Sequence, residues 1–322
     1  MLVDHWIDVH AHFYPPESDA VRRDRLDQMR AACWCTVDPP TWSADQTLAY
    51  MDRTGIQMQM LSNIPKALDR LRMSNDHGAW LVRQHPSRFG FLAAVPTDDP
   101  AAALAEIARA ADTLQPDGFA VTCHYNGVYL SDPRLDPVWA ELDRRRAVVF
   151  CHPDAYAPGS MGRPSALIEV AFETARTFVD MLYQGTFRKF PNVRFVVAHC
   201  GGALPALSGR LLILGHENWI PNPNHVTPAE MRAHLRRLFL DTAATSPTTL
   251  GAALRMTTPR QIVYGSDCGV PCTTDATMDA NIEALLAFEG LTPDQIQAIG
   301  RNALTLFPDA AARIEASAAQ GQ

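Results

Sequence analysis

Short apolar runs alternate with longer stretches of helical spacing along most of the chain. Eight runs have the length and character of buried strands: 6–13, 56–64, 89–96, 117–125, 147–153, 193–200, 238–244 and 261–267. Helical periodicity follows each of them, at 45–54, 68–85, 100–114, 135–146, 165–189, 203–217, 247–256 and 276–288. Strands that alternate with helices form parallel sheets, and eight such repeats favour a sheet that closes into a barrel. The pattern therefore predicts an α/β fold, a (β/α)8 TIM barrel, in one domain over residues 1–322.

Three segments fall outside this repeat. The longest connection, 14–44, follows the first strand run and lacks clear periodicity. Because the active sites of such barrels lie at the carboxyl ends of the strands, we expect this loop to be a lid or a substrate wall. Periodicity at 228–237 indicates an insertion, and residues 290–322 are expected to form a C-terminal helical cap and tail.

The composition excludes several classes of partner. The 322 residues are 47% hydrophobic and 20% charged, with a formal net charge of -7. This balance opposes binding to nucleic acid or to an anionic membrane surface, and no apolar run is long enough to span a bilayer. The seven cysteines are an odd number without an export signal. They predict free thiols, Cys33 and Cys35 included, in a cytoplasmic protein.

Two histidines lie one residue apart in the first strand run, within the stretch IDVHAHFYPP. Because side chains alternate along a strand, Asp8, His10 and His12 are expected to face the barrel interior, with Ile7 and Val9 on the opposite face. Burial of three polar side chains costs free energy unless each of them has a hydrogen-bond partner or binds an ion. A divalent cation bound by both imidazoles, with Asp8 orienting one of them, would satisfy all three. Two hydrogen-bonded core histidines are the alternative.

Three further strand runs end in side chains that can bind a metal or transfer a proton. His152 lies in AVVFCHP, His199 in VRFVVAHCGG and Asp267 in IVYGSDCG. Alternation puts His152 on an inner face and His199 on the same face as Val197. Gly265 leaves space below Asp267. We expect these groups to meet at the carboxyl-end rim of the barrel.

These rim side chains form a mixed nitrogen and oxygen donor set. We interpret His10, His12, His152 and Asp267 as the ligands of one divalent ion, with Zn²⁺ favoured and Mn²⁺, Fe²⁺ or Co²⁺ as alternatives. His199 is interpreted as a catalytic acid/base beside the metal, and Asp267 as a second catalytic group. The fourth strand run ends in FAVTCHYN, without the lysine that often bridges two metals in such barrels. This favours a single ion.

The order H-x-H, CHP, AHCGG and GSD is similar to that of the amidohydrolase superfamily. Within it, the chain resembles the branch that contains aminocarboxymuconate semialdehyde decarboxylase. The stretches NGVYLSDPRLDPVWAELDRRRAVVFCHP and FPNVRFVVAHCGGALP look most like the 6-methylsalicylate decarboxylase-type members. The resemblance implies a mononuclear metal site, no organic cofactor, a homodimer, and non-oxidative decarboxylation of a small aromatic or unsaturated carboxylic acid. The residues above match the family's metal ligands and its catalytic histidine.

The same residues also serve other chemistry. A metal-dependent hydrolase of the same superfamily, acting on a lactone, an amide or a C–C bonded carbonyl, would use His199 and Asp267 for proton transfer. A third possibility is a non-catalytic barrel. Such a protein would be expected to lack at least one metal-ligating side chain, and all four are present in this sequence. For a hydroxybenzoate-like substrate, either Asp267 or His199 is expected to deliver the proton to the ring carbon that loses CO₂.

Other polar residues are weaker candidates for substrate contacts. His124 and Asn126 follow the fourth strand run, and His216 follows a helix. Each is a candidate for substrate binding, with a hydrogen-bonded structural role as the alternative. Arginines of the first loop are candidates for a carboxylate clamp; these are Arg22, Arg23, Arg25 and Arg30.

Overall fold

The computed structural model describes residues 2–36, 41–243 and 246–320. Parts of three predicted elements lie outside the described residues: 37–40 of the first loop, 244 of the seventh strand run, and 321–322 of the tail. None of the described helices is both long enough and apolar enough to cross a membrane.

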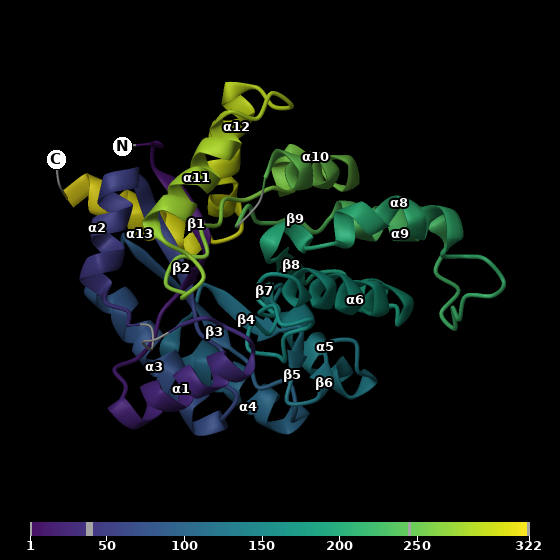
Figure 1. Cartoon of the computed structure of the whole chain (residues 1–322), viewed down its shortest axis with the longest axis horizontal. Coiled ribbons are helices and arrows are strands. Elements are labelled where there is room, and N and C mark those ends of the chain that lie inside the picture. The colour runs from purple at the N-terminus through teal and green to yellow at the C-terminus, as the bar shows by residue number, and fades with distance from the viewer. Residues whose placement is uncertain (1, 37–40, 244–245, 321–322) are drawn as a thin grey trace.

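One parallel sheet forms the centre of the molecule, with helices packed around it (Figure 1). Seven strands follow one another in spatial order: β1 (Trp6–His12), β2 (Ile56–Ser62), β3 (Phe89–Ala94), β4 (Gly118–Thr122), β7 (Val148–His152), β8 (Arg194–Val197) and β9 (Phe239–Leu240). Two further strands, β5 (His124–Tyr125) and β6 (Val128–Tyr129), pair as a small antiparallel hairpin. These seven strands match seven of the eight predicted runs.

The eighth predicted strand, 261–267, is wrong as a regular strand in the described chain. This part of the chain still lies between β9 and β1, because Ile262 bridges to Leu240 on one side and Cys268, the next residue after the segment, bridges to Ala11 on the other. The backbone N–H of Val9 donates to the carbonyl of Tyr264 at 2.9 Å. A continuous ladder is prevented by the Asp8 carboxylate, which accepts the backbone N–H groups of both His10 and Ser266.

Helices occupy the predicted stretches, and one further helix forms within the first loop. They are α1 (Asp19–Ala31), α2 (Ala44–Thr54), α3 (Leu68–Gln84), α4 (Pro100–Arg109), α5 (Asp136–Arg144), α6 (Glu169–Tyr183), α7 (Thr186–Lys189), α8 (Leu204–Leu214), α9 (Pro228–Arg236), α10 (Pro247–Met256), α11 (Asp275–Leu286), α12 (Pro293–Arg301) and α13 (Pro308–Gln320). The predicted helix 165–189 is divided because Gly185 adopts a left-handed conformation between α6 and α7.

The described part of the first loop contains a helix that the sequence pattern did not indicate. Helix α1 lies inside the segment 14–44, and the Ser18 side chain caps it by accepting the backbone N–H of Val21. This helix buries Arg25, Leu26 and Met29. One of its three buried positions is a charged residue, so the apolar periodicity is too weak to read from the sequence.

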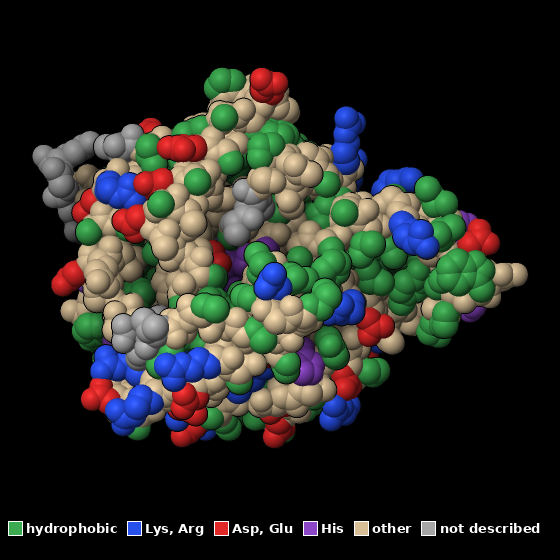
Figure 2. Space-filling model, viewed as in Figure 1, with side chains coloured by type: hydrophobic (Ala, Val, Ile, Leu, Met, Phe, Trp, Pro, Cys, Tyr) green, Lys and Arg blue, Asp and Glu red, His purple; other side chains and the backbone are tan. Residues whose placement is uncertain are grey.

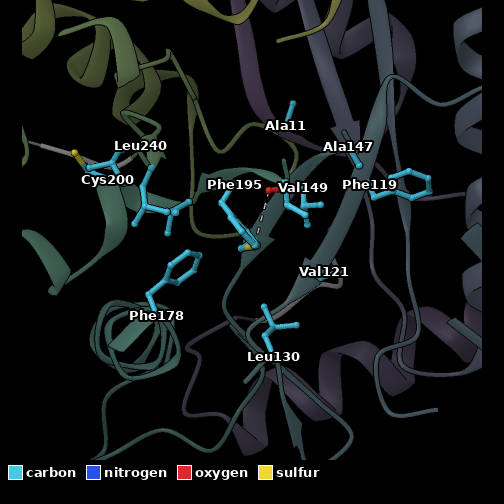
Figure 3. Close-up of a cluster of buried hydrophobic side chains, with 14 of the residues drawn as sticks. Ala11, Phe119, Val121, Leu130, Ala147, Val149, Phe178, Phe195, Cys200 and Leu240 are labelled. Carbon is cyan, nitrogen blue, oxygen red and sulfur yellow. Dashed lines mark hydrogen bonds between the residues drawn. The ribbon is translucent and has the colours of Figure 1, made fainter. Parts of the chain in front are cut away.

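The hydrophobic core has two layers, one on each face of the sheet. The inner layer joins alternate residues of the strands, Phe150 and Val196 among them, to Phe307 from the C-terminal segment. The outer layer packs strands against helices, as Figure 3 shows for Phe195 of β8 beside Phe178 of α6. Residues of the C-terminal segment therefore pack against the interior of the sheet, while the cap over 290–322 stays a prediction.

Strand alternation was predicted incorrectly in two places. Ile7 and Val9 belong to the inner layer and not to the helix-facing one, because the pairing of β1 with β2 shifts register between Asp8 and Ala11. In β8, Val197 packs outward and Val196 inward. Both deviations lie directly before the histidines of interest.

Candidate metal centre and active site

A cavity of about 1030 Å³ opens at the carboxyl ends of the strands. Its walls include the side chains that end β1 and β7, His12 and His152. His199 and Asp267 also line it. His10 lies behind this wall and is fully buried. The structure thus brings together all five residues that the sequence singled out at the strand ends.

The bulge in β1 determines how its two histidines are presented. The Asp8 carboxylate accepts the backbone N–H groups of His10 and Ser266 and the side-chain amide of Gln59. Asp8 therefore fixes the backbone of β1 against its neighbours, and the expectation that it orients an imidazole is wrong. The Nε2 atoms of His10 and His12 lie 3.1 Å apart.

Asp241, at the end of β9, is the residue that orients His10. Its Oδ2 lies 2.7 Å from His10 Nδ1, and both side chains are fully buried. Its Oδ1 accepts the backbone N–H groups of Cys200 at 3.4 Å and Ala243 at 3.0 Å. The carboxylate keeps the proton on His10 Nδ1, so that the Nε2 lone pair faces the other histidines. Asp241 was not among the predicted site residues, although the stretch LFLDT also places a carboxylate directly after an apolar run.

His152 is presented as the alternation of β7 predicted. Its Nδ1 donates to the carbonyl of Pro153 at 2.6 Å. This leaves Nε2 as an unprotonated nitrogen, and within the described chain that buried atom has no hydrogen-bond partner. A buried lone pair without a donor is costly and indicates a missing partner at this point.

His199 reaches the site by a different route from the predicted one. The backbone leaves strand geometry after β8, and both His199 and Cys200 have positive φ, 52° and 54°. This kink turns the imidazole back to the site despite the reversed alternation. Its Nε2 lies 3.6 Å from Asp267 Oδ2. Among the described residues, its buried Nδ1 has no hydrogen-bond partner.

Asp267 lies at the centre of the group. Its Oδ1 is 3.1 Å from His10 Nε2 and 3.2 Å from His12 Nε2. Gly265 allows this close approach by making room for His10 and Asp241, and not only for Asp267 as the sequence indicated. A Cβ at Gly265 would lie 2.8 Å from the Cβ of His10 and 3.0 Å from that of Asp241, so glycine leaves room for these two side chains.

The cluster fits one divalent cation. Two ligand atoms about 2.1 Å from the same ion are roughly 3.0–3.4 Å apart, which matches the separations among His10, His12 and Asp267. The ligand atoms of His10, His152, His199 and Asp267 all lie within 4.8 Å of one another. This group of four contains His199 and omits His12, whereas the sequence-based set contained His12 and placed His199 beside it.

The charges of the cluster also favour a cation. Burial lowers the pKa of His12, and that of His152 falls well below its ordinary value, which favours the neutral imidazoles that bind metals. Burial would also lower the pKa of His10, but the carboxylates of Asp241 and Asp267 outweigh it and raise that pKa to about 10. Burial opposes ionisation of Asp267, yet His10 holds its pKa well below the usual range. The two carboxylates thus require positive charge, which a divalent ion would supply.

The predicted substrate contacts His124, Asn126 and His216 are not among the residues that line the cavity. The chain turns into the β5–β6 hairpin after β4, and the His124 ring packs on Tyr129. The Asn126 amide donates to the carbonyl of Lys66 and to Asp98. His216 is exposed after α8.

Other polar residues line the cavity instead. Of the four first-loop arginines, Arg25 lines it, with its guanidinium 3.8 Å from the centre of the Tyr14 ring and paired with Glu17. Lys66 pairs with Asp154 at 2.6 Å. Nothing in the strand pattern indicated these contacts, because they come from loops and from α1.

The fold and the cluster define a barrel-type protein with a candidate metal centre at its strand ends. The profile of the amidohydrolase family matches residues 7–308, and the chain belongs to this family.

Named relatives and solved structures agree. The chain is 31% identical over 329 residues to a decarboxylase of Penicillium terrestre, covering 94% of each chain. It is 31% identical over 330 residues to a 6-methylsalicylic acid decarboxylase of Aspergillus aculeatus, covering 94% of this chain and 96% of that one. A solved amidohydrolase structure aligns with a TM-score of 0.80 at 25% identity, covering 94% of this chain and 99% of the other. The fold also matches 2,6-dihydroxybenzoate decarboxylase, with a TM-score of 0.79 at 23% identity over 95% and 99% of the chains.

The contact between Asp241 and His10 generates a first prediction. Asp241→Asn removes the charge that orients His10, and we expect it to weaken Mn²⁺ or Zn²⁺ binding by about 10- to 100-fold. Competition with a chelator measures the dissociation constant. Asp136→Asn, at an exposed pair with Lys189, is the matched control. Equal affinities in the two variants would contradict the assignment.

Proposed function

We propose that this chain is a metal-dependent, cofactor-free decarboxylase of small aromatic carboxylic acids of the hydroxybenzoate or salicylate type. The observation that carries the proposal is the convergence of three imidazoles and a carboxylate, with a fourth imidazole alongside, on one cavity. Family membership and 31% identity to a 6-methylsalicylic acid decarboxylase over 94% of the chain support it.

The proposed metal ligands are His10, His12, His152 and Asp267, with His199 as the acid/base. The distances to Asp267 favour this division, because His12 Nε2 lies 3.2 Å from that carboxylate whereas His199 Nε2 lies 3.6 Å away. The group of four within 4.8 Å contains His199 in place of His12 and favours the reverse division, so the variants below decide between them. The nitrogen and oxygen donors suit Zn²⁺ or Mn²⁺. A solved dihydroxybenzoic acid decarboxylase of the same fold has bound manganese, so Mn²⁺ has support equal to that of Zn²⁺.

When bound, the ion would supply positive charge for the substrate's carboxylate and neighbouring hydroxyl oxygens. The chain's own residues then move the proton. His199 or Asp267 delivers it to the ring carbon that bears the carboxylate, and the bond to that carboxylate breaks to release CO₂. A proton replaces CO₂ on the ring, so no redox partner is needed.

Segment 14–34 is proposed to act as the lid that keeps water away from this step. Residues on both sides of α1 line the cavity, Tyr14 and Trp34 among them. Both face Tyr156 of the loop after β7: the hydroxyls of Tyr14 and Tyr156 lie 3.5 Å apart, and the Trp34 ring stacks on that of Tyr156.

We further propose a cytoplasmic homodimer. All seven cysteines are free thiols, as expected in a reducing compartment. Hydrophobic side chains gather over α6 and α8 (Figure 2), where Phe172, Leu207 and Ile213 are exposed, with Trp219 beyond α8. Such a patch is typical of a protein interface, and a second copy of the chain is the proposed partner.

The reaction itself is tested with the purified, metal-loaded protein. We expect it to release one CO₂ per molecule of salicylate or 6-methylsalicylate consumed, and to leave no ¹⁸O from labelled water in the aromatic product. Trapped CO₂ and mass spectrometry measure both. No CO₂ from these acids, together with ¹⁸O in the carboxylate released from an aromatic lactone or amide offered as a second substrate, would instead indicate the hydrolase activity.

The division of roles between His12 and His199 is tested by their alanine variants. His12→Ala is expected to lose the metal, because a ligand is removed. His199→Ala is expected to keep one equivalent of metal while its turnover falls by about 100-fold or more. Metal content is measured by elemental analysis and turnover by CO₂ release. The opposite pattern, with metal lost from His199→Ala and retained in His12→Ala, would reverse the assignment.

The proposed dimer is tested by sedimentation. Ile213→Glu places a charge in the exposed apolar patch and is expected to yield monomers at micromolar concentration, where the unaltered chain sediments as a dimer. Leu286→Glu, at an exposed site on α11, is the control and should remain dimeric. A monomeric unaltered chain would refute the proposal.

A further inference from the structure

The cavity is much larger than a hydroxybenzoate. Such an acid has about ten heavy atoms and would occupy on the order of 300 Å³, if each atom takes the ~30 Å³ share of a water molecule. The cavity measures about 1030 Å³ and extends without interruption from the metal cluster to helix α1. A substrate of the proposed class that sits on the cluster therefore leaves more than half of this space unfilled.

The part of the cavity away from the cluster has a mainly apolar wall. It lies between the inner side of α1, the start of α3 and the segment that leads into α6. We call it the outer chamber and define it by Val21, Met73, Ala166, Leu167 and Val170. Met73 and Leu167 are exposed large hydrophobic residues, with 51% and 68% of their surfaces accessible. Exposed apolar side chains that converge on one cavity indicate an apolar ligand.

Charged groups in the same walls are paired with one another. Lys66 pairs with Asp154, and Arg25 pairs with Glu17. Arg70 lies 4.0 Å from Asp24. Each basic side chain therefore has an acidic partner from the cavity wall, and an anionic group on the ligand would have to displace one. The chamber favours an uncharged substituent.

We propose that the outer chamber binds an apolar substituent on the substrate's ring, so that the substrates are aromatic hydroxy acids with an alkyl or alkenyl chain of several carbons. The inference rests on the proposed function for the carboxylate end, which sits at the metal cluster. The chain would extend from the ring toward α1 and hold it in one orientation by burying its methylenes. Chain length would then determine specificity.

Binding of the product class tests the chamber separately from the reaction. Dissociation constants of 3-methyl-, 3-propyl-, 3-pentyl- and 3-heptylphenol are measured calorimetrically with the manganese-loaded protein. Each added methylene is expected to lower the dissociation constant by about two- to fourfold, because burial of one CH₂ group contributes up to about a fourfold gain in affinity. A constant or rising value along the series would overturn the inference.

A substitution that fills the outer chamber tests where the alkyl chain binds. Ala166→Phe places a ring in the outer chamber and is expected to reduce the heptyl-to-methyl affinity ratio by at least about tenfold. Ala105→Phe, at an exposed position of α4 away from the cavity, should keep the ratio of the unaltered chain. An equal ratio in both variants would contradict the location of the chain-binding site.

Decarboxylation of the matching 2-hydroxy-6-alkylbenzoates separates the two proposals. We expect kcat/KM to rise with chain length in parallel with the affinities. Turnover of the methyl acid, with alkylphenol affinities that do not change with chain length, would support the proposed function and contradict the proposal that the outer chamber binds an alkyl chain. Alkylphenol affinities that rise steeply with chain length, without CO₂ release from any of the acids, would support alkyl binding in the outer chamber and contradict the proposed decarboxylase function.

Discussion

The carboxylate of Asp241 is the contact on which the geometry of the site depends. One oxygen holds the His10 ring at 2.7 Å, and the other accepts the backbone N–H of Cys200, next to His199. A single buried group thus positions one imidazole of the cluster and the turn that carries another. Gly265 is the matching constraint, because any side chain there would collide with both His10 and Asp241. Together they allow two neighbouring elements to approach closely enough for one ion.

A second buried carboxylate, Asp8, has a structural role beside it. It accepts backbone N–H groups from β1 and from the segment that replaces the eighth strand. Regular pairing is lost there, and the register of β1 shifts. The benefit is that His10 and His12 both face the site, with their Nε2 atoms 3.1 Å apart. Burial of the ligands then keeps two of the imidazoles neutral and ready to bind a cation.

Much of this arrangement could be predicted from the sequence, and the failures have physical causes. The strand and helix order follows from local periodicity, and His10, His12, His152, His199 and Asp267 do meet at the strand ends. Ideal alternation failed at Val9 and Val197, because a bulge and a left-handed turn break the twofold pattern. Asp241 and the wall formed by α1 depend on contacts between distant segments, which periodicity does not reveal. The hairpin after β4, which takes His124 away from the cavity, is a tertiary feature of the same kind.

All of these contacts matter for function only if the cluster holds one divalent ion through nitrogen and oxygen donors. Elemental analysis combined with X-ray absorption at the metal edge measures the number of ions and the identity of their ligand atoms. We expect one Zn²⁺ or Mn²⁺ per chain, coordinated by nitrogen and oxygen atoms at about 2.0–2.2 Å. Cys272 provides a real alternative, because its Sγ lies 3.7 Å from the Asp267 carboxylate. A sulfur ligand, two ions per chain, or no retained ion would rule out a single ion bound by nitrogen and oxygen alone.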